Sequence, residues 1–77
     1  MQIQIKTLTG RNIPVDVEPT DKIMRIKELM EEKEGIHPSQ QKLIHLGNNL
    51  DDDLTVQEAK IDPGATLHVV LALRGGH

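Results

Sequence analysis

The chain closes with the stretch Thr66-Leu67-His68-Val69-Val70-Leu71-Ala72-Leu73-Arg74-Gly75-Gly76-His77. Residues 66–73 are apolar or β-branched except for one histidine and include neither proline nor glycine, which is typical of a β-strand. Because side chains alternate along a strand, one face carries Leu67, Val69, Leu71 and Leu73, and the other carries His68, Val70 and Ala72. We therefore predict a domain over residues 1–73, followed by a flexible tail over residues 74–77 with too little apolar surface to be buried.

Two glycines in such a tail suit a segment whose carboxyl end is itself the reacting group. Glycine has no Cβ, so a Gly-Gly tail can enter a narrow enzyme cleft and bring its carbonyl close to a cysteine or a nucleotide. Gly75 and Gly76 are therefore candidate functional residues, and the chemistry is expected outside the folded part of the chain.

The start of the chain predicts a β-hairpin. Residues 1–6 alternate strictly, with Met1, Ile3 and Ile5 facing inward, and residues 7–10 form a loop in which Gly10 can take a left-handed conformation. Residues 12–18 return as a second strand that buries Ile13, Val15 and Val17. Pro14 cannot donate a ladder hydrogen bond, so this strand is predicted at an edge of the sheet.

A helix is predicted next, capped by Thr20 or Asp21, running to about Glu34 and ending at Gly35 in a left-handed conformation. Its buried stripe consists of Ile23, Ile26 and Met30. Lys27 falls within that stripe, where its ammonium group needs a charged partner, and the acidic run 51–53 supplies the candidates.

The second half predicts a strand over residues 41–46, with Leu43 and His45 inward, and a turn over residues 47–49. Thr55 and Glu58 have the spacing of a capping box, which predicts a short helix before the last strand. The order of elements is β-β-α-β-(short α)-β, an α+β arrangement.

The composition of the chain argues against several classes of function. With 77 residues, the chain makes one small domain with an entirely aliphatic core, since it contains no Phe, Tyr or Trp. A net charge of −3 argues against binding nucleic acid, and no apolar run or signal peptide indicates a membrane or secreted protein, so we expect it in the cytoplasm and nucleus. The chain has no cysteine, and its four histidines lack metal-ligand spacing. We predict neither a metal site nor an enzyme.

Several separated motifs resemble the ubiquitin-like modifiers over the whole chain. The tail Leu71-Ala72-Leu73-Arg74-Gly75-Gly76 looks like their activation tail, and further matches are Lys6-Thr7-Leu8-Thr9-Gly10, Lys33-Glu34-Gly35-Ile36, Pro38, Gln40-Gln41, Leu43-Ile44 and Gly47. The chain most resembles the Rub (neddylation) modifiers that are attached to cullins, especially at Ala72, where ubiquitin carries arginine. The resemblance implies a β-grasp fold, a mixed sheet packed on one helix with the first and last strands as central neighbours. It also favours Asp52 as the partner of Lys27.

The resemblance implies a function as a protein modifier. An activating enzyme would adenylate Gly76 with ATP, a conjugating enzyme and a ligase would pass it to a lysine of a cullin-type substrate, and proteases would process and deconjugate it. The chain itself would bind no cofactor and act as a monomer. The tail residues that such enzymes would recognise are Leu71, Ala72, Leu73, Arg74 and Gly75. His77 is either a one-residue precursor extension, removed after Gly76 by a processing hydrolase, or the remnant of a purification tag.

Two surfaces are candidates for binding partners. The first combines outward-facing side chains that the fold would gather on one face: Leu8, Ile44, His68 and Val70. It resembles the family's recognition surface. The second consists of Ile36, Leu71 and Leu73.

Three other functions remain compatible with the sequence. A divergent ubiquitin is favoured by Gln2 and by the turn over residues 62–64, which depart from the Rub pattern, while His45 and Ala59 replace aromatic residues typical of both groups. A β-grasp sulfur carrier also ends in Gly-Gly but forms a thiocarboxylate. A non-covalent binding module would not need Gly75 and Gly76 at all.

Overall fold

The computed structural model describes residues 1–72, which fold into one mixed sheet, one α-helix and one short 3₁₀-helix. In chain order the elements are β1 (Gln2–Lys6), β2 (Asn12–Asp16), α1 (Ile23–Glu34), η1 (Pro38–Gln40), β3 (Gln41–His45), β4 (Asn48–Asn49) and β5 (Thr66–Leu71). The predicted tail over residues 74–77 lies outside the described residues, as does Leu73.

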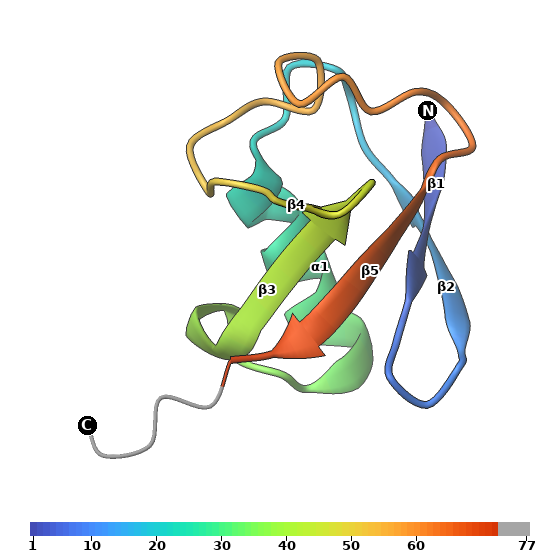
Figure 1. Ribbon diagram of the computed structural model, residues 1–77, viewed down its shortest axis with the longest axis vertical. Coiled ribbons are helices and arrows are strands. Elements are labelled where there is room, and N and C mark those ends of the chain that lie inside the picture. Colours follow the sequence, from blue (N-terminus) through green and yellow to red (C-terminus); the bar gives the residue numbers. More distant parts are fainter. Residues whose placement is uncertain (73–77) are drawn as a thin grey trace.

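The strand order is β2-β1-β5-β3-β4 (Figure 1), with β1 and β5 parallel and the other pairs antiparallel. This is the predicted α+β, β-grasp arrangement, with the first and last strands as central neighbours. Pro14 lies in β2 opposite Gln4, and β2 is an edge strand, as the missing N–H of proline requires.

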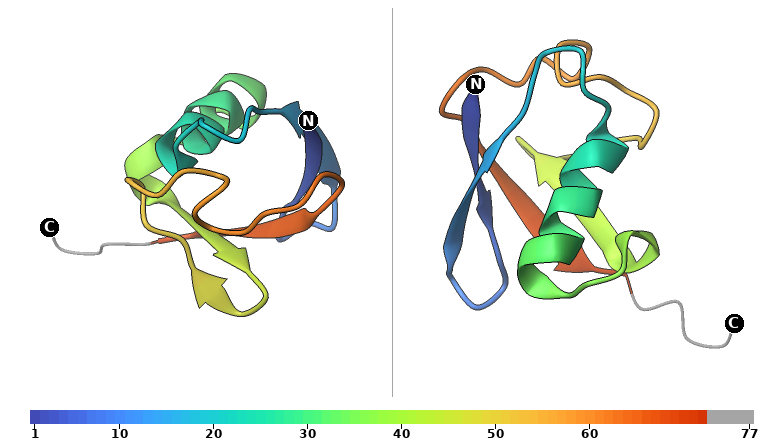
Figure 2. Two further views of the ribbon diagram at one scale, coloured as in Figure 1. Left: turned by 90° about the horizontal axis from the view of Figure 1, so that it is seen from above. Right: turned by 180° about the vertical axis from the view of Figure 1, so that it is seen from behind.

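Helix α1 crosses one face of the sheet (Figure 2), and the core lies between the two layers. The predicted helix stripe Ile23, Ile26 and Met30 is fully buried. From the sheet it meets the inward side chains of the predicted strands, namely Ile3, Ile5, Ile13, Val15, Leu43, Leu67 and Val69. The alternation read from the sequence is therefore confirmed for the body of the sheet.

The N-terminus of α1 differs from the prediction. The helix begins after Lys22, and neither Thr20 nor Asp21 caps it, because the Asp21 carboxylate accepts the Glu18 N–H at 2.8 Å instead. Two N–H groups of the first turn bond to a distant loop: the Ile23 N–H donates to the Leu54 carbonyl at 2.8 Å, and the Met24 N–H donates to the Asp52 carbonyl at 3.2 Å. The other end follows the prediction, since Gly35 has φ 75°.

Two local predictions in the second half are wrong. The chain turns at Leu46 and Gly47, both with positive φ (53° and 82°), so Asn48 and Asn49 form the strand β4 and not a turn. Thr55 and Glu58 do form a reciprocal capping box, with both N···O distances 3.0 Å, but residues 56–60 make turns and no helix. Lys60, with φ 58°, ends the segment after a single turn.

The buried lysine has the predicted partner. The Lys27 side chain is 9% exposed, and its Nζ lies 2.5 Å from Asp52 Oδ1, while the Asp52 side chain is 43% exposed. The same loop residue thus offers its carbonyl to Met24 and its carboxylate to Lys27. The contact ties the loop after β4 to the middle of α1.

Asp52→Asn should lower the free energy of unfolding by about 2 kcal/mol, because it leaves the buried ammonium of Lys27 without a countercharge. Lys27→Met should lower the free energy of unfolding by a smaller amount, because water can solvate the half-exposed carboxylate that remains. The chain has no Tyr or Trp, so urea unfolding is followed by far-ultraviolet circular dichroism. Equal stability of the wild type and Asp52→Asn would show that the ion pair stabilises nothing.

Candidate functional site

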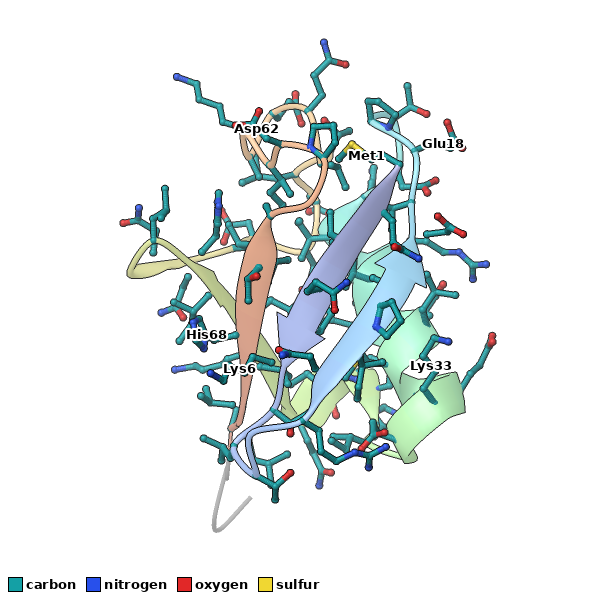
Figure 3. All side chains as sticks on the ribbon, turned by 90° about the vertical axis from the view of Figure 1, so that its right-hand side faces the viewer. Met1, Lys6, Glu18, Lys33, Asp62 and His68 are labelled. Atoms are coloured by element: carbon teal, nitrogen blue, oxygen red, sulfur yellow. The ribbon has the colours of Figure 1, made fainter. Side chains whose placement is uncertain are left out.

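The outer face of the sheet gathers most of the predicted first surface. The strand register places Ile44 of β3 opposite His68 of β5, and His68 opposite Lys6 of β1. Figure 3 shows Lys6 and His68 close together on the side of the sheet away from Lys33 of α1. His68 is exposed and Ile44 is half-buried, so an apolar side chain on this face is available to a partner.

Leu8 joins this surface from the hairpin between β1 and β2. Its side chain is 71% exposed, and it lines a groove of about 160 Å³ together with Thr7, Thr9, Glu34, Ile36, Val69, Val70 and Leu71. We call this cavity the end groove. Arg11 holds the hairpin beside it, since Arg11 Nη1 donates to Glu34 Oε1 at 3.1 Å. Leu8 and Val70 thus line the same groove, and the strand register places Val70 on the outer face of the sheet with Ile44 and His68.

Leu71 lies on the predicted face of β5 but is not buried there. It shares the parity of the buried residues Leu67 and Val69, yet 48% of it is exposed. Strand β1 pairs with β5 only as far as His68, so beyond that point β5 is flanked by β3 alone and the end groove opens beside it. Leu71 and the half-buried Ile36 line that groove, as the second predicted surface requires, whereas Leu73 lies outside the described residues.

The last described residue is held to the sheet. Leu71 pairs with Gln41, and the Ala72 N–H donates to the Gln40 carbonyl at 2.7 Å. The predicted tail residues beyond this hydrogen bond, Arg74, Gly75, Gly76 and His77, lie outside the described residues. The anchor fixes the point from which residue 73 and its successors start.

Sequence reasoning missed the buried side chain of Gln41. Its Nε2 donates to the carbonyls of Lys27 and Ile36, both at 2.9 Å, and the residue is 2% exposed. Gln41 thus fixes the segment that carries Ile36 against α1. The strand parity that Gln41 shares with Leu43 indicates an inward side chain, although glutamine is usually exposed.

Two exposed lysines on the outer face were also missed. Lys42 lies opposite Val70, and Lys6 lies opposite His68, so each cation adjoins the first surface. Alternation alone places Lys42 outward with Ile44, but only the pairing register shows that it neighbours Val70. The face is therefore apolar at its centre and basic beside it.

Within residues 1–72, no cluster of three or more His, Asp or Glu side chains could hold a metal ion. In the same part of the chain, no helix combines the length and the apolar character needed to cross a bilayer. The candidate functional features of residues 1–72 are two binding surfaces and the backbone of Ala72, which is hydrogen-bonded to Gln40.

Comparison with known proteins extends these observations. The pattern of the ubiquitin family matches residues 3–74. The ubiquitin-like protein NEDD8 of Dictyostelium discoideum is 59% identical over 76 residues, which cover 99% of each chain. The NEDD8-like protein RUB1 of Saccharomyces cerevisiae is 53% identical over the full length of both chains, and RUB3 of Arabidopsis thaliana is 51% identical over 99% of this chain and 97% of its own.

Gln41→Ala should lower the free energy of unfolding by about 2–4 kcal/mol, because it leaves a cavity and removes the side-chain donor to the carbonyls of Lys27 and Ile36. The amide resonances of Ile36 and its neighbours should shift at the same time, since Gln41 holds that segment. The matched control is Gln40→Ala, which removes an exposed side chain and keeps the backbone carbonyl that binds Ala72. A small and equal effect of both variants would contradict the assigned role of Gln41.

Proposed function

The chain belongs to the ubiquitin family, and from this we propose that it is a neddylation-type modifier, attached through Gly76 to lysine side chains of target proteins. NEDD8-like members of this family are modifiers and not enzymes, and the same holds for this chain. The observation that carries the proposal is the full-length similarity to NEDD8 and Rub proteins, combined with the sequence Leu71 to Gly76.

The chemistry takes place on the carboxyl group of Gly76. The carboxylate attacks the α-phosphate of ATP in the activating enzyme and releases pyrophosphate. The enzyme's cysteine thiolate then displaces AMP and forms a thioester, which is exchanged onto a conjugating enzyme. A lysine amine of the target finally attacks the thioester carbonyl, so that an isopeptide bond forms and the thiol leaves. His77 must be cleaved off first, because Gly76 needs a free carboxylate for the first step.

The fold supports such a role by anchoring the tail. Ala72 is bound to the Gln40 carbonyl, and Leu71 pairs with β3, so a following diglycine segment starts from a fixed point at the end of a central strand. Glycines at positions 75 and 76 let the tail enter a narrow cleft, and Arg74 can pair with carboxylates near its entrance. The folded domain thus supplies the surfaces that partners bind, while the partners supply catalysis.

The proposed partners follow from this pathway. They are an activating enzyme, a conjugating enzyme, a ligase, processing and deconjugating proteases, and cullin-type substrates, acting on a monomeric modifier in the cytoplasm and nucleus. ATP is consumed by the activating enzyme, and the modifier needs no bound cofactor. Leu8, Ile44, His68 and Val70, with Lys6 and Lys42 beside them, fit a partner that presents apolar side chains next to carboxylates.

The proposal is tested by thioester formation. Protein ending at Gly76 is incubated with ATP and either a NEDD8-type or a ubiquitin-type activating enzyme, and adducts that a thiol reductant removes are measured. We expect an adduct with the NEDD8-type enzyme and none with a variant that lacks Gly76. Failure to form a thioester with either enzyme would refute the proposal. A gain of sulfur in the intact mass after a sulfurtransferase reaction would instead identify a sulfur carrier.

Ala72→Arg should raise charging by the ubiquitin-type enzyme by roughly tenfold or more, because arginine can form a charge-assisted pair where alanine cannot. Charging by the NEDD8-type enzyme should fall or stay unchanged. The neutral variant Ala72→Gln controls for side-chain size. An unchanged preference in Ala72→Arg would show that this position does not select the pathway.

Ile44→Ala should weaken binding to a protein partner by roughly tenfold, as expected when a central apolar contact is removed. The domain should stay folded, because Ile44 is only half-buried. Affinity for the activating enzyme is measured by calorimetry and unfolding by circular dichroism. Thr66→Ala, on the same outer face of β5 but outside the first surface, is the control and should bind like the wild type.

A further inference from the structure

A second groove lies between the β3–β4 hairpin and the turns of residues 54–60. It has a volume of about 310 Å³, and it is lined by the apolar side chains Leu46, Leu50, Leu54 and Ala59, with His45, Asn48, Asn49 and Lys60 around them. We call it the hairpin groove. Ile44 is not part of it, so it is distinct from the surface described above.

Backbone hydrogen bonds fix both walls of the hairpin groove. On one side, the Leu50 N–H donates to the Leu43 carbonyl at 2.9 Å and closes the hairpin. On the other side, the Ala59 N–H donates to the Thr55 carbonyl at 2.9 Å. The groove is therefore already formed in the free protein, so a ligand need not first order its walls.

Leu46 at the tip of the hairpin is in an unfavourable position for a leucine. Its side chain is 85% exposed, and its φ of 53° is one that asparagine or glycine adopts with less strain. Folding thus gains nothing from leucine at this site. Strained backbone that displays a particular side chain is often found where a protein contacts a ligand.

The charge of the hairpin groove indicates the kind of ligand. Lys60 is its one permanently charged lining residue, and it forms no ion pair with any residue of 1–72. The carboxylate of the neighbouring Glu58 accepts the Thr55 N–H and is thereby held in the capping box. The groove therefore joins an apolar cavity to an unpaired cation and the amide groups of two asparagines.

We propose that the hairpin groove binds a partner peptide through one aromatic side chain that is followed by a carboxylate. The aromatic ring fills the space between Leu46, Leu50 and Ala59, and the carboxylate pairs with Lys60. An aromatic ring has the shape and the low conformational cost that a preformed apolar groove favours. The partner must supply the ring, because this chain contains no Phe, Tyr or Trp.

The test uses 3-phenylpropionate as the probe and the unconjugated protein, so its outcome is independent of whether Gly76 can be activated. Titration followed by amide chemical shifts should give a dissociation constant of roughly 1–10 mM, as expected for a fragment of this size. The largest shifts should fall on Leu46, Leu50, Ala59 and Lys60. The neutral 3-phenylpropionamide should bind several-fold more weakly.

Three variants separate the parts of the proposal. Ala59→Tyr should fill the groove and abolish the shifts, Lys60→Asn should remove the preference for the acid over the amide, and Leu46→Asn should weaken binding. Asparagine is chosen at positions 46 and 60 because it tolerates positive φ. Leu46→Asn should also raise the urea midpoint, which excludes unfolding as the cause of lost binding. Leu8→Asn, the same change at an exposed leucine of another loop, should bind like the wild type.

Shifts confined to the first surface or the end groove would overturn the proposal, as would full binding by Ala59→Tyr. Equal binding of the acid and the amide to the wild type would overturn the assignment of a carboxylate to Lys60.

Discussion

The parallel pairing of β1 with β5 joins the two ends of the folded chain at the centre of the sheet. It aligns Gln4, Ile5 and Lys6 with Thr66, Leu67 and His68, and the Gln4 N–H donates to the Ala65 carbonyl at 2.9 Å. The chain between these strands contains β2, α1, β3 and β4, and it must return to the centre of the same sheet. Because β5 is central, its inward residues Leu67 and Val69 are buried, and the described chain ends just after an internal strand of the sheet.

Much of this arrangement could be predicted, because it follows from short-range patterns in the sequence. Strict alternation identified the inward residues of β1 and β2, and the helix stripe identified Ile26 and Met30. Pro14 placed β2 at an edge, and Gly35 marked the end of α1. In each case a single residue type, or the regular spacing of apolar residues, predicts the local feature without reference to distant segments. The pairing of β1 with β5, in contrast, came from the family resemblance.

The features that the sequence did not reveal depend on contacts between distant segments. Thr20 and Asp21 were predicted as caps, but the loop over residues 51–56 supplies carbonyls that satisfy the first turn of α1. Alternation placed Leu71 on the same face as Leu67 and Val69, but it is exposed where they are buried, because β1 pairs with β5 only as far as His68. The same holds for the candidate surface. Alternation predicts that Ile44 and His68 face outward, but only the register of three strands shows that lysines lie beside them.

Strand β3 separates the two ends of the molecule that carry the proposed functions. Gln41, at its start, pairs with Leu71 beside the anchored tail, and His45, at its end, borders the hairpin groove. At about 3.4 Å per residue, these positions lie roughly 14 Å apart along the strand. A peptide in the hairpin groove therefore leaves the start of the tail uncovered. In the proposed function, attachment through Gly76 would leave the hairpin groove free, so that a conjugated molecule would still be able to bind a peptide.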